Sequence, residues 1–186
     1  MRKRMTRKLW MMAPLSAPAL AFTLIALTDC GQSMDDVQKE VAKEEAAAAV
    51  AAAANAKAGQ DYLAQIGKQP GVVTLPSGLM YKVVSSPDPK GAQPAPNDQV
   101  KANYEGRLVN GQVFDSSYVR NQPATFPLNR VVQGWQLAVP MMHKGDTWML
   151  YVPPSLGYGD RGAGDAIPPN SVLIFKIQLL DINPKA

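Results

Sequence analysis

The chain has 186 residues, 46% of them hydrophobic, which fits one folded domain with extensions. Five of its 19 Lys and Arg residues lie within the first eight positions, and they account for the formal net charge of +4. From Cys30 onward, 14 basic residues balance 14 acidic ones without forming a basic stripe, which argues against a nucleic-acid-binding protein.

Residues 1–30 have the pattern of an export signal. A basic start precedes an apolar run from Leu9 to Leu27, and small and polar residues follow. Pro14 and Pro18 interrupt the apolar run and disfavour a transmembrane helix. We therefore expect an exported protein.

Cys30 is the only cysteine, so the chain has no internal disulfide and no cysteine-based metal site. The preceding Leu27-Thr28-Asp29 resembles a bacterial lipobox, in which the cysteine is lipidated, although Asp29 stands where that pattern has a small residue. Gly31 replaces the aspartate that retains many such lipoproteins at the inner membrane, which favours the outer membrane or the periplasm. The alternatives are cleavage after Ala19-Leu20-Ala21, which leaves Cys30 as a free thiol, and an uncleaved membrane anchor.

Residues 31–70 are predicted to form an alanine-rich helix that ends near Gly67 and Pro70. Its apolar stripe is thin and consists mainly of Met34, Val37 and Val41. Such a helix buries little surface by itself. It is interpreted as a solvated spacer that holds the following domain away from a membrane, with a homodimerisation helix as the alternative.

The folded domain is predicted to span residues 71–186. Its clearest strand is Val100–Leu108, where inward and outward side chains alternate. Asn110-Gly111 follows and is typical of a tight hairpin turn in which both central residues have positive φ. The returning strand then carries Phe114 and Asp115.

The period changes between Val131 and Val139, where Val132, Trp135 and Val139 share one helical face. This helix is too short to stand alone and requires a sheet to cover it. Further extended segments lie at 79–83, 124–128, 147–152 and 172–182, and a loop rich in Gly and Pro spans 153–171. The prediction is an α+β domain, with an antiparallel sheet of five to six strands wrapped around one short helix.

The residue types exclude most enzyme chemistries. His143 is the only histidine and lies in a polar turn, and there is no phosphate-binding loop or metal-ligand cluster, so no cofactor or metal is expected. What remains is a set of aromatic and branched residues around Asp115: Tyr104, Phe114, Phe126, Val131, Val132, Trp135, Tyr158, Ile167 and Phe175. Each alone fits an ordinary core, but together they suit an apolar ligand pocket.

Six motifs in order resemble FKBP-type peptidyl-prolyl cis-trans isomerases, most closely the bacterial macrophage-infectivity-potentiator subgroup. They are LPSGLMYKVV, VKANYEGRLVNGQVFDSS, VVQGWQLAV, M-x-x-GD, YVPPSLGYGDRGAG and IPPNSVLIFKIQLLDI, and they cover residues 71–183 almost completely. The resemblance implies a sheet wrapped round a short helix and catalysis of X-Pro isomerisation. The implied substrates are proline-containing unfolded or exported polypeptides, and macrolides are the implied inhibitors.

The resemblance also implies roles for the residues. Asp115, Phe114, Tyr104, Tyr158 and Phe175 would be catalytic. Val131, Val132, Trp135, Ile167, Arg120 and Phe126 would bind substrate. Trp135 would form the floor, and the Tyr158 hydroxyl and the Ile167 N–H would hold ligand carbonyls. Ala124, Ala163 and Ala166 are smaller than their counterparts in many relatives, which implies a more open rim.

Two other functions remain open from the sequence. A non-catalytic holdase would use the same apolar cleft to bind unfolded chains, with residues 31–70 pairing two copies. A purely structural envelope lipoprotein is a third reading, which gives no reason for an acid among aromatic residues.

Overall fold

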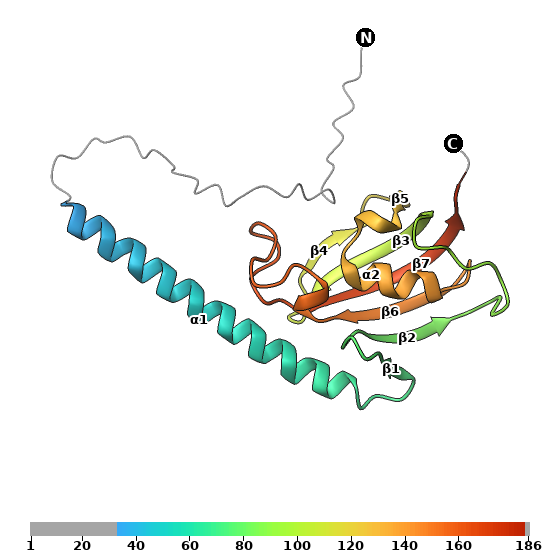
Figure 1. Ribbon diagram of the computed structural model, residues 1–186, viewed down its shortest axis with the longest axis horizontal. Coiled ribbons are helices and arrows are strands. Elements are labelled where there is room, and N and C mark those ends of the chain that lie inside the picture. The colour runs from blue at the N-terminus through green and yellow to red at the C-terminus, as the bar shows by residue number, and fades with distance from the viewer. Residues whose placement is uncertain (1–32, 185–186) are drawn as a thin grey trace, which may run out of the picture. The chain divides into compact units, whose positions relative to one another are not determined.

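Figure 1 shows the computed structural model of the protein, which describes residues 33–184. The predicted export signal, the lipobox-like segment and Cys30 lie outside the described residues. Within residues 33–184, none of the helices combines the length and the apolar character needed to cross a membrane. The chain divides into two compact units at Val50/Ala51.

The first unit contains the start of helix α1 (Met34–Ile66). Ser33 caps this helix, because its hydroxyl accepts the Asp36 N–H at 3.3 Å, while the Asp36 carboxylate accepts the Ser33 N–H at 3.4 Å. This reciprocal pair satisfies helix donors that otherwise lack partners. The side chains of Met34, Val37 and Val41 are exposed.

The second unit contains one antiparallel sheet of seven strands, which confirms the predicted α+β class. The strands are β1 (Val72–Thr74), β2 (Met80–Ser85), β3 (Gln99–Leu108), β4 (Val113–Ser116), β5 (Ala124–Pro127), β6 (Thr147–Val152) and β7 (Leu173–Ile182). Their order is β1-β2-β6-β7-β3-β4, and β5 also pairs with β3. The count exceeds the predicted five to six because β1 has only three residues and β4 and β5 share one partner strand.

Burial alternates along β3 as the sequence predicts, with Tyr104 and its even-numbered neighbours facing inward. In the turn after β3, however, only Gly111 has a positive φ, of 87°. The Leu108 carbonyl accepts the Gly111 N–H at 2.9 Å, and the Leu108 N–H donates to the Gln112 carbonyl at 2.9 Å. The prediction that both Asn110 and Gly111 take positive φ was wrong, because the hairpin uses a longer loop with glycine alone in the left-handed region.

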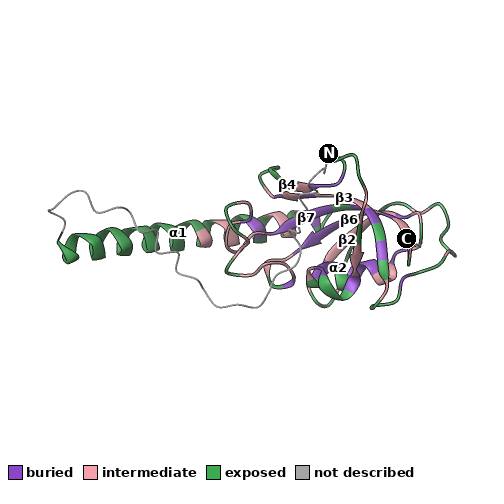
Figure 2. Ribbon diagram, turned by 90° about the horizontal axis from the view of Figure 1, so that it is seen from above, coloured by how far each residue is buried: buried purple, intermediate pink, exposed green. Residues whose placement is uncertain are grey.

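One short helix, α2 (Gln133–Ala138), packs on the sheet and buries Trp135 and Ala138. Three 3-10 turns complete the secondary structure of residues 33–184: η1 (Leu128–Arg130), η2 (Val139–Met141) and η3 (Pro154–Leu156). A Cβ on Gly134 would lie 2.6 Å from the Val152 side chain, so glycine allows α2 to approach β6. Figure 2 shows the buried residues concentrated on the central strands and on α2.

The C-terminal part of α1 belongs to the same compact unit as the sheet. This unit begins at Ala51, whereas the predicted domain boundary lies near residue 71. Ile66 is buried with Tyr151 and Ile174, and Tyr62 and Leu63 pack against them. Residues 51–66 therefore differ from the predicted solvated spacer, because they cover part of the sheet.

Candidate active site

Three polar side chains from adjacent segments form a closed hydrogen-bonded ring. Tyr104 lies on β3, Asp115 on β4, and Arg120 in the loop that follows β4. The Tyr104 hydroxyl donates to Asp115 Oδ2 at 2.5 Å, and Arg120 Nη1 donates to Asp115 Oδ1 at 2.5 Å. Arg120 Nη2 closes the ring by donating to the Tyr104 hydroxyl at 2.8 Å. The β3–β4 register produces this ring, because it places Asp115 opposite Gly106, two residues from Tyr104.

The ring holds Asp115 in place as an anchored charge. Each carboxylate oxygen already accepts a hydrogen bond, and the side chain remains 25% exposed. Burial, and then the hydrogen bond to Asp115, raise the pKa of Tyr104, so its hydroxyl keeps its proton. The hydrogen bond to Asp115 also raises the pKa of Arg120, which therefore stays cationic. The hydrogen bonds from Tyr104 and Arg120 fix the orientation of the Asp115 carboxylate, which suits it to orienting a dipole.

Trp135 is the centre of an aromatic cluster behind this ring. It makes edge-to-face contacts with Tyr104 and Phe126 at centroid distances of 5.6 Å, and with Phe175 at 5.4 Å. Phe114 extends the cluster through an edge-to-face contact with Phe175 at 5.6 Å. This geometry is the favoured one for aromatic pairs, so the rings brace one another.

The cluster has an enclosed side and an accessible side. Trp135 and Phe175 are 0% exposed and Tyr104 is 2% exposed, so these three rings form the back of the site. Phe114 and Phe126 are only half-buried and face its accessible side. The rings therefore form one packed cluster, and the enclosed rings can act on a ligand mainly through the half-buried ones.

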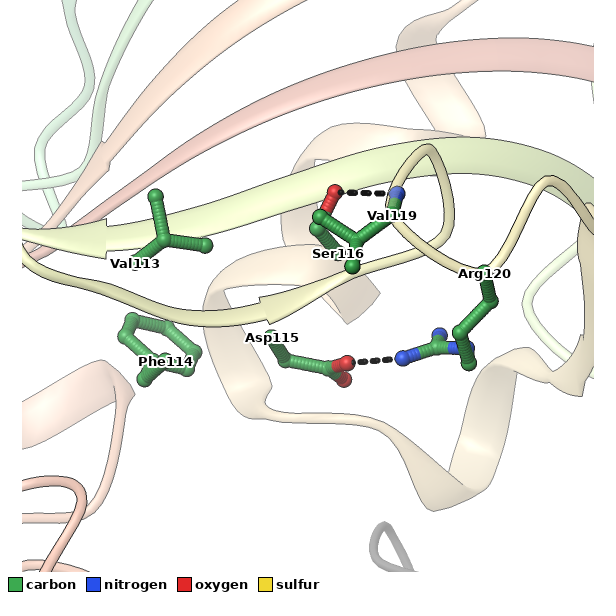
Figure 3. Close-up of a pocket in the computed structure, with 6 residues that line it drawn as sticks. All are labelled: Val113, Phe114, Asp115, Ser116, Val119 and Arg120. Atoms are coloured by element: carbon green, nitrogen blue, oxygen red, sulfur yellow. Dashed lines mark hydrogen bonds and ion pairs between the residues drawn. The ribbon is translucent and has the colours of Figure 1, made fainter.

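An open surface hollow of about 370 Å³ lies against β4. Its lining residues are Val113, Phe114, Asp115, Ser116, Val119 and Arg120. Figure 3 shows the side chains of Phe114, Asp115 and Arg120 lying along one side of β4. Phe114 and Asp115 thus join the aromatic cluster to space that a ligand can enter.

The long loop between β6 and β7 contributes Tyr158 and Ile167. Burial raises the pKa of the half-buried Tyr158, and the charge of Asp115 raises it further. Ile167 is buried, and its N–H donates to the Ala163 carbonyl at 3.2 Å in a small antiparallel bridge. To donate to a ligand carbonyl, the Ile167 N–H would have to form a bifurcated hydrogen bond or break its bond to Ala163.

A different backbone group, which the sequence analysis did not single out, makes no hydrogen bond among the described residues. Among the described residues, none accepts a hydrogen bond from the Val132 N–H, and Val132 is half-buried directly before α2. Its position could have indicated this, because the residue that caps a helix donates no bond within it. Val131 is buried, and its carbonyl accepts the Gln136 side chain at 2.7 Å.

Comparison with known proteins places this geometry in a family. The pattern of the FKBP-type peptidyl-prolyl cis-trans isomerase matches residues 90–180, and that of the domain amino-terminal to such isomerases matches residues 22–83. The chain belongs to the FKBP-type peptidyl-prolyl cis-trans isomerase family. The resemblance of its six motifs is thereby confirmed.

Two relatives and one structure illustrate the similarity of this FKBP-type chain. It is 50% identical to peptidyl-prolyl cis-trans isomerase Mip of Coxiella burnetii over 131 residues, which is 70% of this chain and 56% of the relative. It is 42% identical to outer membrane protein MIP of Legionella longbeachae over 132 residues, or 71% of this chain and 56% of the relative. The crystal structure of FkpA from Escherichia coli superposes with a TM-score of 0.71 at 35% identity, covering 84% of this chain and 76% of that one. The FKBP-type chain thus spans little more than half the length of these two curated relatives.

Proposed function

We propose that this protein is a peptidyl-prolyl cis-trans isomerase that acts on X-Pro bonds of polypeptides. The observation that carries the proposal is the anchored carboxylate of Asp115, held by Tyr104 and Arg120 beside a braced aromatic wall. Membership of the isomerase family supports it. The implied substrates are unfolded or newly exported chains, in which proline is accessible.

The mechanism follows from the barrier of the reaction. An amide resists rotation by roughly 18–20 kcal/mol because of resonance, and the twisted transition state is less polar than the planar ground state. An apolar wall therefore disfavours the ground state more than the transition state, which lowers the barrier. No proton has to leave the substrate, so the scheme requires no general base.

Each residue has a proposed role within this scheme. The proline ring packs beside Phe114 and Phe126, and the enclosed rings of Trp135, Tyr104 and Phe175 support these two from behind. Asp115, oriented by Arg120, acts on the twisted amide through its charge. Val131, Val132 and Ile167 surround the substrate, and the Tyr158 hydroxyl holds one of its carbonyls.

An isomerisation assay on a proline tetrapeptide tests the proposal. Asp115→Ala and Phe114→Ala are each expected to reduce kcat/KM at least about 10-fold, because each removes a group that faces the reacting amide. Asp181→Ala is the matched control, because it removes another ion-paired carboxylate that lies outside the aromatic cluster. Circular dichroism shows whether the variants remain folded, and a macrolide that occupies the same cleft is expected to inhibit. Wild-type turnover in both site variants would remove the assignment.

The second candidate function, a non-catalytic holdase, draws on the exposed apolar residues at the start of α1. Met34, Val37, Val41 and Val50 are between 44% and 76% exposed. They offer a surface for an unfolded chain or for a second copy of this protein. A holdase would suppress aggregation of a client while leaving X-Pro exchange at its spontaneous rate, and sedimentation of Val37→Ser and Val41→Ser variants tests homodimerisation.

The cell envelope is the proposed location, either the periplasm or the outer membrane. The name of the Legionella relative includes the outer membrane, and the N-terminal 30 residues of this chain have the pattern of an export signal. Lipidation of Cys30 would anchor the protein there. Mass spectrometry of the mature N-terminus distinguishes a diacylated Cys30 from cleavage after Ala21.

A further inference from the structure

Helix α1 is connected to the long loop of the candidate active site by two side-chain amides. Asn55 Nδ2, on the helix, donates to the Pro169 carbonyl at 3.3 Å. Asn170 Nδ2, on the loop, donates to the Ala52 carbonyl at 3.5 Å. The two bonds run in opposite directions across one partly buried contact, here called the amide clasp (Asn55 and Asn170 with their carbonyl partners Pro169 and Ala52).

Within the loop, the clasp continues directly to Tyr158. The Asn170 N–H donates to the carbonyl of Gly159, the neighbour of Tyr158, at 2.9 Å. Asn170 also has a φ of 58°, a left-handed conformation that asparagine tolerates better than most residues. A chain of hydrogen bonds therefore runs from the Ala52 carbonyl through Asn170 to the backbone beside Tyr158.

The helix is held at this position by close packing as well as by the clasp. A Cβ on Gly59 would lie 2.6 Å from Val172 Cγ2, so only glycine permits this approach of the helix to the start of β7. Glycine is a poor helix former, and a buried glycine within a helix is therefore explained by the contact it allows. In Figure 1, the part of α1 from Ala51 to Ile66 lies beside the loop and ends near β1.

The loop needs an external support because it has little regular structure of its own. Gly159, Gly162 and Gly164 all have positive φ, and the loop contains one isolated bridge, between Ala163 and Ile167. Ordering such a segment costs conformational entropy, and a binding site that must order it on ligand arrival loses affinity. A helix that holds the loop beforehand removes part of that cost.

We infer that residues 51–59 of α1 support the isomerase site. Asn55 and Asn170 are positioning residues that hold the Tyr158–Ile167 loop in place. The inference rests on the proposed function and deepens it. The clasp acts on substrate binding rather than on the twisting step, because its residues touch the loop and not the amide. Whatever engages the helix and shifts this contact would change the affinity for X-Pro substrates.

The test uses Asn55→Ala and Asn170→Asp in the full chain, with Gln60→Ala as the matched control on an exposed position of the same helix. Asn55→Ala improves helix propensity while removing the clasp, and Asn170→Asp keeps tolerance of positive φ but replaces the amide donor. Two quantities are measured: amide hydrogen exchange of residues 157–171 relative to β3 and β7, and the separate kcat and KM on a proline peptide. We expect faster exchange confined to the loop, and a KM raised about 2- to 10-fold at unchanged kcat. The control should behave as wild type.

A rescue experiment separates the contact from general damage to the fold. Gly59→Ala is expected to displace the helix and to reproduce the loop exchange and KM of Asn55→Ala. Combining it with Val172→Ala removes the obstructing methyl groups and should restore both quantities toward those of Val172→Ala alone.

The outcomes distinguish this inference from the proposed function. If the wild-type protein fails to accelerate X-Pro exchange, the proposed function is lost, while hydrogen exchange still reports on the clasp. If the wild type is active and Asn55→Ala matches Gln60→Ala in loop exchange or in KM, the positioning role is overturned. A fall in kcat at constant KM would also overturn it.

Discussion

The Tyr104 hydroxyl donates to Asp115 Oδ2 at 2.5 Å, and this bond links the buried aromatic cluster to the one acid at its edge. Because Arg120 contacts both partners, the three side chains behave as a unit. We expect Tyr104→Phe and Asp115→Asn to be non-additive, with a coupling in the range of about 0.5–3 kcal/mol in the free energy of unfolding. A double-mutant cycle by denaturant titration measures this coupling energy. Additive effects of the two substitutions would show that the Tyr104–Asp115 hydrogen bond does not couple the two residues.

Gly106 on β3 sets the positions of two aromatic rings. A Cβ at this residue would lie 2.5 Å from Phe114 Cζ and 2.9 Å from Phe175 Cε1. Gly106→Ala is therefore expected to displace Phe114, to destabilise the fold by about 1–3 kcal/mol, and to lower kcat/KM markedly.

Gly111→Ala is the matched control for this substitution. Gly111 also lies in the β3–β4 hairpin, but its added Cβ meets nothing within 4 Å and only strains a φ of 87°. It should cost stability without changing kcat/KM of the folded fraction. Equal losses of activity in the two variants would show that ring placement is not the cause.

Where local periodicity was strong, the sequence predicted correctly which of the candidate residues are buried. Alternation along β3 predicted that Tyr104 faces inward, and the helical spacing around Trp135 predicted its burial. The mutual contacts of Tyr104, Asp115 and Arg120 could not be obtained from periodicity, because the loop after β4 has none. Arg120 was assigned from the family resemblance, and its atomic partners came only from the structure.

The docking of α1 was missed for a physical reason. The alanine tract indicated a helix with little to bury, and the sequence analysis named Phe175 but not Ile174 on the segment 172–182. The consecutive apolar residues 172–175 were the available signal, because an uninterrupted apolar run indicates a strand that is covered on both faces. Ile174 packs with Tyr151 and Ile66, so the second face is the one that receives α1.

The two described tryptophans should respond differently to substitution by phenylalanine. Trp148 Nε1 donates to Asp146 Oδ2 at 3.1 Å, and its ring stacks on Tyr81 at 4.5 Å. The Trp135 Nε1 is buried without a partner among the described residues. Trp148→Phe removes a bond to a buried carboxylate, whereas Trp135→Phe removes an unsatisfied donor.

We therefore expect Trp148→Phe to cost about 1–3 kcal/mol more stability than Trp135→Phe, while Trp135→Phe has the larger effect on isomerisation. Denaturant titration of both variants checks which one loses more stability, and kcat/KM checks which one loses more activity. Trp135→Phe being the more destabilising change would mean that its volume in the cluster outweighs the bond of Trp148.

Stability at alkaline pH should depend on Tyr104. Burial, followed by the hydrogen bond to Asp115, raises the pKa of Tyr104 above its ordinary value of 10, and burial also raises the pKa of Tyr158. The folded state then holds these protons more tightly than the unfolded state does. The stabilisation is fully present below pH 10 and is lost as the pH rises toward the folded-state pKa, at up to about 1.4 kcal/mol per pH unit for each group.

Denaturant titrations between pH 9 and pH 11.5 measure this loss. Tyr104→Phe should have a shallower decline of the unfolding free energy above pH 10 than the wild type, because one raised group is gone. Phe126→Leu is the control, because it disturbs the same cluster without removing a proton and should keep the wild-type slope. If the unfolding free energies of Tyr104→Phe and the wild type decline in parallel, the pKa of Tyr104 is the same in the folded and unfolded states. The description of Tyr104 as a neutral hydroxyl bonded to the Asp115 carboxylate would then be wrong.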